Sequence, residues 1–137
     1  MAELLIVDDD EDIVDALADV AAGEGHTVRI AHDGVEGLEC LKSAPVDLIV
    51  LDVEMPRLTG PEMAYELFVL DAGREKIPIV LLSGKVDLAR VAATVGTPYF
   101  LAKPPALDAL LALMTRALAE RTPPRPRFDA HRSSARL

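Results

Sequence analysis

The chain has 137 residues, half of them apolar, which is enough for one core and too short for two ordinary domains. Residues 121–137 hold five arginines against one aspartate, a net charge of +4, so residues 1–120 carry −13 of the total of −9. The strong negative charge of residues 1–120 argues against direct nucleic-acid binding, because nothing there would neutralise the phosphates. We see no signal-peptide pattern and no apolar run long enough to span a bilayer, and we expect a cytoplasmic protein without membrane contact.

Five apolar runs of strand length alternate with segments of helical period, which is typical of strand–helix units around a parallel sheet. The predicted strands are Leu4–Val7, Thr27–Ala31, Leu48–Leu51, Ile79–Leu82 and Tyr99–Ala102. The first, third and fourth are continuously apolar, as expected for strands with helices on both faces. We therefore predict an α/β fold with a doubly wound, five-stranded parallel sheet.

The helical segments follow the strands in turn. Apolar residues recur at intervals of three and four over residues 13–21 and 35–41. A short fourth helix is expected at about Val86–Val95 and a last one at about Ala106–Arg121, whose sheet-facing side chains should be Leu107, Leu110, Leu111, Met114 and Leu118. Beyond Arg121 the sequence has no apolar period and three prolines within five residues, a pattern typical of disorder. The predicted domain is residues 1–121, followed by a Pro/Arg-rich tail at 122–137 that we interpret as solvated linker.

Polar residues stand where four of the predicted strands end. Asp8 and Asp9 follow the first strand, Asp52 the third, Ser83 the fourth and Lys103 the fifth. Because chemistry gathers at the carboxyl ends of parallel strands, these side chains should converge. Acids, a hydroxyl and an amine at one place point to divalent-metal and phosphoryl chemistry.

The acidic run after the first strand has two interpretations. Asp10 is a good helix N-cap, and the two acids after it suit a first helical turn, so these three need no site role. Asp8 and Asp9 come too early for capping to explain both, and carboxylates at a strand end suit magnesium.

Asp52 could be a turn residue, but a carboxylate buried at a strand end needs a partner: Lys103, a metal ion, or both. It could also be a nucleophile that forms an acyl phosphate. Ser83 could simply open a turn or donate to a phosphoryl oxygen, and Lys103 could be a surface residue or balance the negative charge. The Lys103–Pro104 bond is a candidate for cis.

The order of these residues resembles the receiver domain of two-component response regulators. The matching text is Leu-Leu-Ile-Val-Asp-Asp-Asp at 4–10, Asp-Leu-Ile-Val-Leu-Asp at 47–52, Met-Pro at 55–56 and Lys-Pro at 103–104. The resemblance covers residues 3–121. It implies a flavodoxin-like fold with five helices and the strand order 2-1-3-4-5.

The resemblance also implies a function. Asp52 would accept a phosphoryl group from a histidine kinase, a histidine phosphotransfer protein or a small phosphodonor. Magnesium, or manganese in its place, would be held by Asp9, Asp52 and the backbone carbonyl of Glu54, with Asp8 acting through water. The chain would then be a signalling protein rather than an enzyme, although it would catalyse its own phosphorylation and dephosphorylation.

Ser83 and Lys103 would contact the phosphoryl oxygens, and a switch would couple Ser83 to Phe100 on the fifth strand. Phe100 cannot donate a hydrogen bond, so the switch would rely on ring packing, while Tyr99 should point to the other side of the strand. The face formed by the fourth helix, fifth strand and fifth helix would contact a downstream protein or a second copy of the chain. The side chains of Glu54 and Lys85 are candidates for setting the phosphoryl lifetime.

Two other functions compete with this interpretation. A receiver-like module could bind a partner protein without phosphorylation, although the complete set of acids, hydroxyl and lysine weighs against it. A haloacid-dehalogenase-like phosphatase also uses a strand-end aspartate and magnesium, but it wants an Asp-x-Asp pair after its first strand, and here the corresponding text is Asp52-Val-Glu54 in mid-chain.

Overall fold

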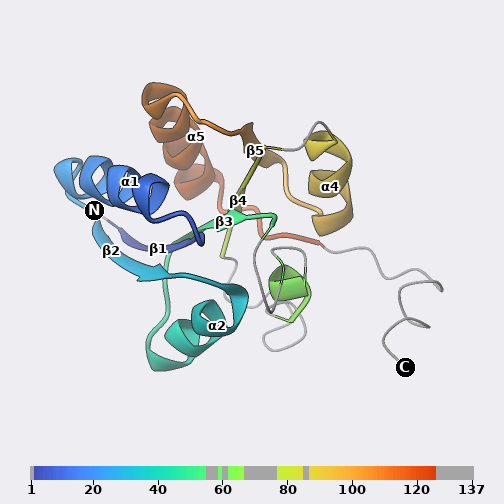
Figure 1. The fold of residues 1–137 in the computed structure, drawn as a ribbon, viewed down its shortest axis with the longest axis horizontal. Helices are drawn as coiled ribbons and strands as arrows, with labels where there is room; N and C mark the ends of the chain where they lie inside the picture. Colours follow the sequence, from blue (N-terminus) through green and yellow to red (C-terminus); the bar gives the residue numbers. More distant parts are fainter. Residues whose placement is uncertain (1, 55–58, 60–61, 67–76, 85–86, 126–137) are drawn as a thin grey trace.

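The sheet has five parallel strands in the order β2-β1-β3-β4-β5 (Figure 1). The computed structural model describes residues 2–54, 59, 62–66, 77–84 and 87–125. The strands are β1 (Glu3–Val7), β2 (Thr27–Ala31), β3 (Leu48–Asp52), β4 (Ile79–Ser83) and β5 (Tyr99–Ala102). All four strand pairings are parallel, which confirms the predicted doubly wound sheet and its strand order.

Helices cover both faces of the sheet. They are α1 (Glu11–Gly23), α2 (Gly34–Ser43), α4 (Leu88–Val95) and α5 (Leu107–Glu120), and residues 62–66 are helical between β3 and β4. The buried side chains of α1 and α5 pack in one core cluster and those of α4 in another, which also contains Met63 and the inner side of α2. Within the described part of the chain, no helix is long and apolar enough to cross a membrane.

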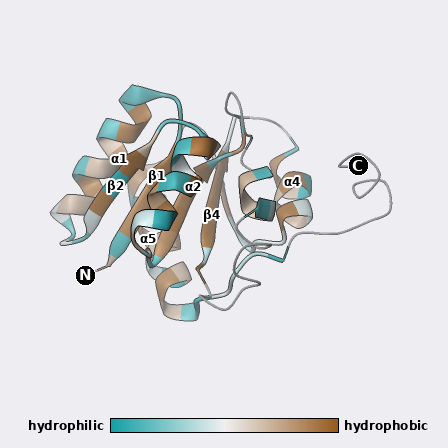
Figure 2. Cartoon of the chain, turned by 90° about the horizontal axis from the view of Figure 1, so that it is seen from below, coloured by the Kyte–Doolittle hydropathy of each residue, from teal (hydrophilic) through white to brown (hydrophobic). Residues whose placement is uncertain are grey.

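The apolar runs became the strands because both of their faces are covered. Every residue of β3 and of β4 is buried, whereas the edge strands β2 and β5 keep exposed positions. Figure 2 shows apolar colour along β1 and β4 and hydrophilic patches on α1. The carboxyl ends of β3 and β4 are therefore buried between the helical layers.

One part of the predicted core is wrong. Leu107 is 41% exposed, although we expected it to face the sheet. The buried residues of α5 are Leu110, Met114 and Ala117, and Leu113 and Leu118 pack against the same cluster. Leu111, which we also expected to face the sheet, is only partly buried and is not part of this cluster. Leu107 occupies the first turn of the helix, where apolar periodicity alone does not show how far the sheet extends beneath it.

Candidate functional site

Four strands bring polar side chains to one edge of the sheet. Asp52 is the last residue of the central strand β3 and is paired in register with Leu82 of β4. Asp8 directly follows β1, Ser83 ends β4 and Lys103 directly follows β5. The Lys103–Pro104 peptide bond is cis, as the sequence suggested. The structure thus brings Asp8, Asp52, Ser83 and Lys103 to the carboxyl edge, where parallel sheets place their ligands.

The ammonium group of Lys103 lies between two carboxylates. Its Nζ is 2.7 Å from Asp8 Oδ2 and 3.1 Å from Asp52 Oδ1. The exposed fractions of the side chains are 2% for Asp8, 4% for Asp52 and 16% for Lys103. Carboxylates so deeply buried need a counter-charge, because each has lost most of its hydration. The pairing of Asp52 with Lys103 is therefore observed, and it leaves metal binding open.

The lysine does not fully compensate the two acids. Burial and the charge of Asp8 raise the pKa of Asp52 from 3.8 to about 6, against the opposing effects of Lys103 and of a backbone hydrogen bond from Glu54. Burial lowers the pKa of Lys103, but the interactions with Asp8 and Asp52 outweigh it and raise that pKa above 10.5. Lys103 stays protonated at neutral pH, and the surplus negative charge acts on Asp52.

A third carboxylate completes a ligand set for a hard cation. One oxygen from each of Asp8, Asp9 and Asp52 lies within 4.8 Å of the other two. Asp9 is exposed while the other two are buried, so the cluster is open to water on one side. With Lys103 in place, three ionised carboxylates leave a local charge of about −2, and oxygen ligands are those that Mg²⁺ and Mn²⁺ prefer. The residues present fit the divalent ion that the sequence suggested.

The acidic run after β1 separates into different contacts. The Asp10 carboxylate caps α1 by accepting from the backbone N–H groups of Asp12 and Ile13. Asp8 Oδ1 accepts from the backbone N–H of Asp10 at 3.0 Å, which fixes the turn and aims Oδ2 at the lysine. The predicted cap is confirmed, and the turn after β1 explains why two adjacent aspartates differ so much in burial.

The two aromatic residues of β5 point in opposite directions. Tyr99 is fully buried and Phe100 is 38% exposed, as the alternation of a strand predicts. The Tyr99 hydroxyl donates to Glu120 Oε1 of α5 at 2.8 Å. Ser83 is fully buried, and its carbonyl accepts from the backbone N–H of Lys103 at 2.9 Å. Phe100 is thus the β5 aromatic that lies on the exposed side.

The remaining predicted residues lie after β3 and β4. Glu54 is exposed and follows β3, and its backbone N–H bonds the Asp52 carboxylate. Lys85 and the Met-Pro pair at 55–56 lie outside the described residues, so their parts in the site stay predictions.

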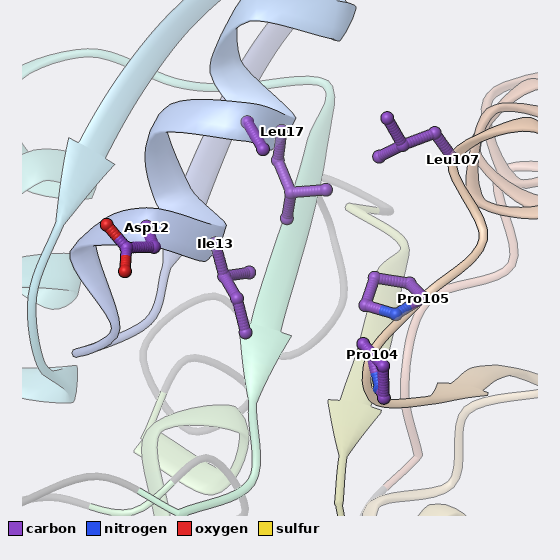
Figure 3. A pocket seen from close by; sticks show the side chains of 7 residues that line it. Asp12, Ile13, Leu17, Pro104, Pro105 and Leu107 are labelled. Atoms are coloured by element: carbon purple, nitrogen blue, oxygen red, sulfur yellow. The ribbon is translucent and has the colours of Figure 1, made fainter.

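An apolar groove of about 280 Å³ lies beside the site and was not found from the sequence (Figure 3). It runs between α1 and the connection from β5 to α5, and its lining residues are Asp12, Ile13, Ala16, Leu17, Pro104, Pro105 and Leu107. Figure 3 shows Ile13 and Leu17 of α1 on the side that faces the two prolines and Leu107. The sequence signal for this groove is the pair Pro104 and Pro105. Proline has no backbone N–H to donate to a neighbouring strand, so two consecutive prolines indicate that their apolar rings lie outside the sheet.

The chain matches one family over most of its length. The sequence model of the response regulator receiver domain matches residues 4–115. Response regulator MprA of Mycobacterium ulcerans is 42% identical over 121 residues, which are 87% of this chain and 50% of the relative. The chain therefore spans about half the length of the curated relatives it matches.

Solved structures of receiver domains have the same fold as this chain. A CheY-like receiver domain protein from Methanospirillum hungatei superposes with a TM-score of 0.79 at 26% identity, covering 88% of this chain and 96% of that one. The receiver domain of NtrX from Brucella abortus has a TM-score of 0.75 at 30% identity, covering 85% of this chain and 98% of that domain.

Proposed function

The chain belongs to the response regulator receiver family, and we propose that Asp52 is its phosphoacceptor in a magnesium-dependent two-component phosphorelay. The observation that carries the proposal is the placement of Asp52. It is buried at the end of the central strand, 3.1 Å from Lys103 Nζ, and grouped with two further carboxylates. A nucleophile, a cationic partner for phosphoryl oxygens and ligands for a divalent ion thus share one edge of the sheet.

In the proposed reaction an Asp52 oxygen attacks the phosphorus of a phosphohistidine. The new O–P bond forms as the P–N bond breaks, and the histidine nitrogen keeps the electron pair and takes up a proton. Magnesium, when bound, would neutralise the oxygens of the group in transit. Asp52 must be ionised to attack, and its pKa of about 6 leaves most of it ionised at pH 7.

Each neighbour has a proposed part. Asp9, Asp52 and the Glu54 backbone carbonyl would hold the cation, with Asp8 acting through water. Lys103 would exchange its contact with Asp52 for a phosphoryl oxygen and keep Asp8, which is already the nearer of its two partners at 2.7 Å against 3.1 Å.

Ser83 would donate its hydroxyl to another phosphoryl oxygen, and its movement would change the packing of Phe100 on the exposed side of β5. The new group brings about two negative charges, enough to bias a two-state surface. We propose a histidine kinase or histidine phosphotransfer protein as donor, and a downstream protein or a second copy as the partner of the α4–β5–α5 face. The proposed compartment is the cytoplasm.

Incubation with acetyl phosphate and magnesium, followed by intact-mass measurement, tests the proposal. We expect a phosphate adduct on the wild type and none on Asp52→Asn. An adduct on both proteins would refute the assignment of Asp52, and no adduct on either would favour a receiver-like module that binds partners without phosphorylation.

The lifetime of the adduct tests Glu54 separately. If its exposed side chain orients or blocks the attacking water, Glu54→Ala will change the rate of dephosphorylation while the adduct still forms on Asp52. An unchanged rate would remove Glu54 from this role. Lys85→Ala is the parallel variant for the other candidate.

A further inference from the structure

The chain does not leave the domain where α5 ends. Arg121 takes the left-handed conformation that terminates the helix, and its guanidinium Nη1 lies 3.4 Å from both the backbone oxygen and Oδ1 of Asp47. Residues 121–125, here called the strap, then run from the end of α5 toward α4 (Figure 1). The strap thus joins the two helical layers.

The far end of the strap is held by the turn between α4 and β5. The backbone N–H of Arg125 donates to the carbonyl of Gly96 at 3.0 Å, and Pro124 is buried. The approach is so close that a Cβ on Gly96 would overlap the carbonyl group of Arg125. The strap is therefore held at both ends, with a buried proline next to its far end.

Gly96 is required for two separate reasons. It terminates α4 with φ of 79°, a conformation that favours glycine, and it leaves room for the strap. Gly25 after α1 shares the first reason, with φ of 91°, but nothing lies within 4 Å of a Cβ placed there. The two glycines thus form a matched pair in which only one touches the strap.

Helix α4 connects the strap to the proposed phosphorylation site. The helix is the first described helix after Ser83 in the chain, and its C-cap is Gly96. The N-cap residue Asp87 makes no side-chain capping bond, and the helix buries only three residues among those described. The first residue of the helix, Leu88, is buried in the core, so a shift that repacks Leu88 also displaces the carbonyl at the other end of this short helix that holds the strap.

We propose that the strap is a latch on α4 whose docking is linked to phosphorylation of Asp52. The docked strap stabilises the position that α4 has in the unphosphorylated protein, and phosphorylation shifts α4 and weakens the bond from Arg125 to Gly96. Because such coupling is reciprocal, a weakened strap favours the phosphorylated conformation by the same factor. The inference rests on the proposed function, and it gives the segment after α5 a regulatory part rather than that of a passive linker.

Amide exchange of Arg125 tests the first direction. Beryllium fluoride with magnesium serves as a stable mimic of a phosphoryl group on a carboxylate. We expect it to accelerate exchange of the Arg125 amide by about fivefold or more, the lower end of usual allosteric coupling. The control amide is Gly25, which donates to Ala22 and lies on another helix end. Unchanged Arg125 exchange, or the same acceleration in Asp52→Asn, would overturn the latch.

Two pairs of variants test the reverse direction, the effect of the strap on binding at the proposed phosphorylation site. Arg125→Pro removes the N–H donor, whereas Arg125→Ala keeps it; Gly96→Ala displaces the strap, whereas Gly25→Ala introduces similar backbone strain elsewhere. The first member of each pair should bind beryllium fluoride more tightly than its control, by the factor seen in exchange. Equal affinities within both pairs would overturn the latch even when the acetyl phosphate adduct forms on Asp52. If the wild type forms no adduct, the proposed function fails and the latch fails with it.

Discussion

Asp52 should cost the folded protein stability at neutral pH when no metal is bound. Its pKa is about 6 in the folded state, against 3.8 as the ordinary value that applies to the unfolded chain. Between these values the unfolded chain releases a proton that the folded protein retains, so the contribution of Asp52 to stability is highest below about pH 4 and falls until the pH passes 6. A difference of about two pH units at about 1.4 kcal/mol per unit gives an upper bound of about 3 kcal/mol.

Asp52→Asn removes this loss, because the amide does not titrate. In urea unfolding with a chelator present, the stability of the variant relative to the wild type should rise by about 1–3 kcal/mol between pH 4 and pH 7. Magnesium should narrow the gap at pH 7 by stabilising the wild type. As a control, Asp15→Asn changes an exposed carboxylate on α1 and should stay within about 0.5 kcal/mol of the wild type at both pH values. A gap that does not depend on pH would refute the reasoning.

Three further substitutions probe other contacts. Thr97→Val removes a buried hydroxyl that donates to the Ile79 carbonyl at 2.6 Å and accepts from the Tyr99 N–H at 3.2 Å; thermal unfolding should show a loss of about 1–3 kcal/mol. Arg29→Lys loses the fork that bonds three carbonyl oxygens at the end of α2, and urea unfolding should show a loss of about 1–2 kcal/mol. Lys103→Met removes the ammonium between the two buried acids, and the initial rate of adduct formation from acetyl phosphate should fall by about a hundredfold.

The sequence predicted the elements that build the site because their signals are local. Continuous apolar runs located β3 and β4, and the structure extends each by one residue, to Asp52 and Ser83. The parallel arrangement then brings the strand ends together without further information. The cap at Asp10 was equally local, since an aspartate before an apolar helical period satisfies the first free N–H groups.

The rest depends on contacts that have no periodic signal. The sequence placed Lys103 near Asp52, but the shorter contact of Lys103 is with Asp8. The turn after β1, in which Asp8 accepts from the Asp10 N–H, positions the Asp8 carboxylate for this contact. The strap was expected to be solvated from its second residue onward, yet Pro124 is buried and Arg125 bonds Gly96. A single backbone hydrogen bond and one proline ring leave no pattern in the sequence. The domain boundary near residue 121 stays a prediction.

The charges of the site explain why phosphorylation of this chain should require a cation. Three carboxylates and one ammonium share this edge of the sheet, and burial together with the charge of Asp8 raises the pKa of Asp52 to about 6. Most of Asp52 is therefore ionised at pH 7, and the surplus negative charge of the cluster repels an incoming phosphoryl group. Any ligand that binds the ionised form more tightly must lower this pKa by linkage. Lys103 also lowers the pKa of Asp52, but burial and the charge of Asp8 outweigh its effect. The acidic surroundings that repel an anionic phosphodonor are thus the same ones that would recruit a divalent cation to offset that repulsion.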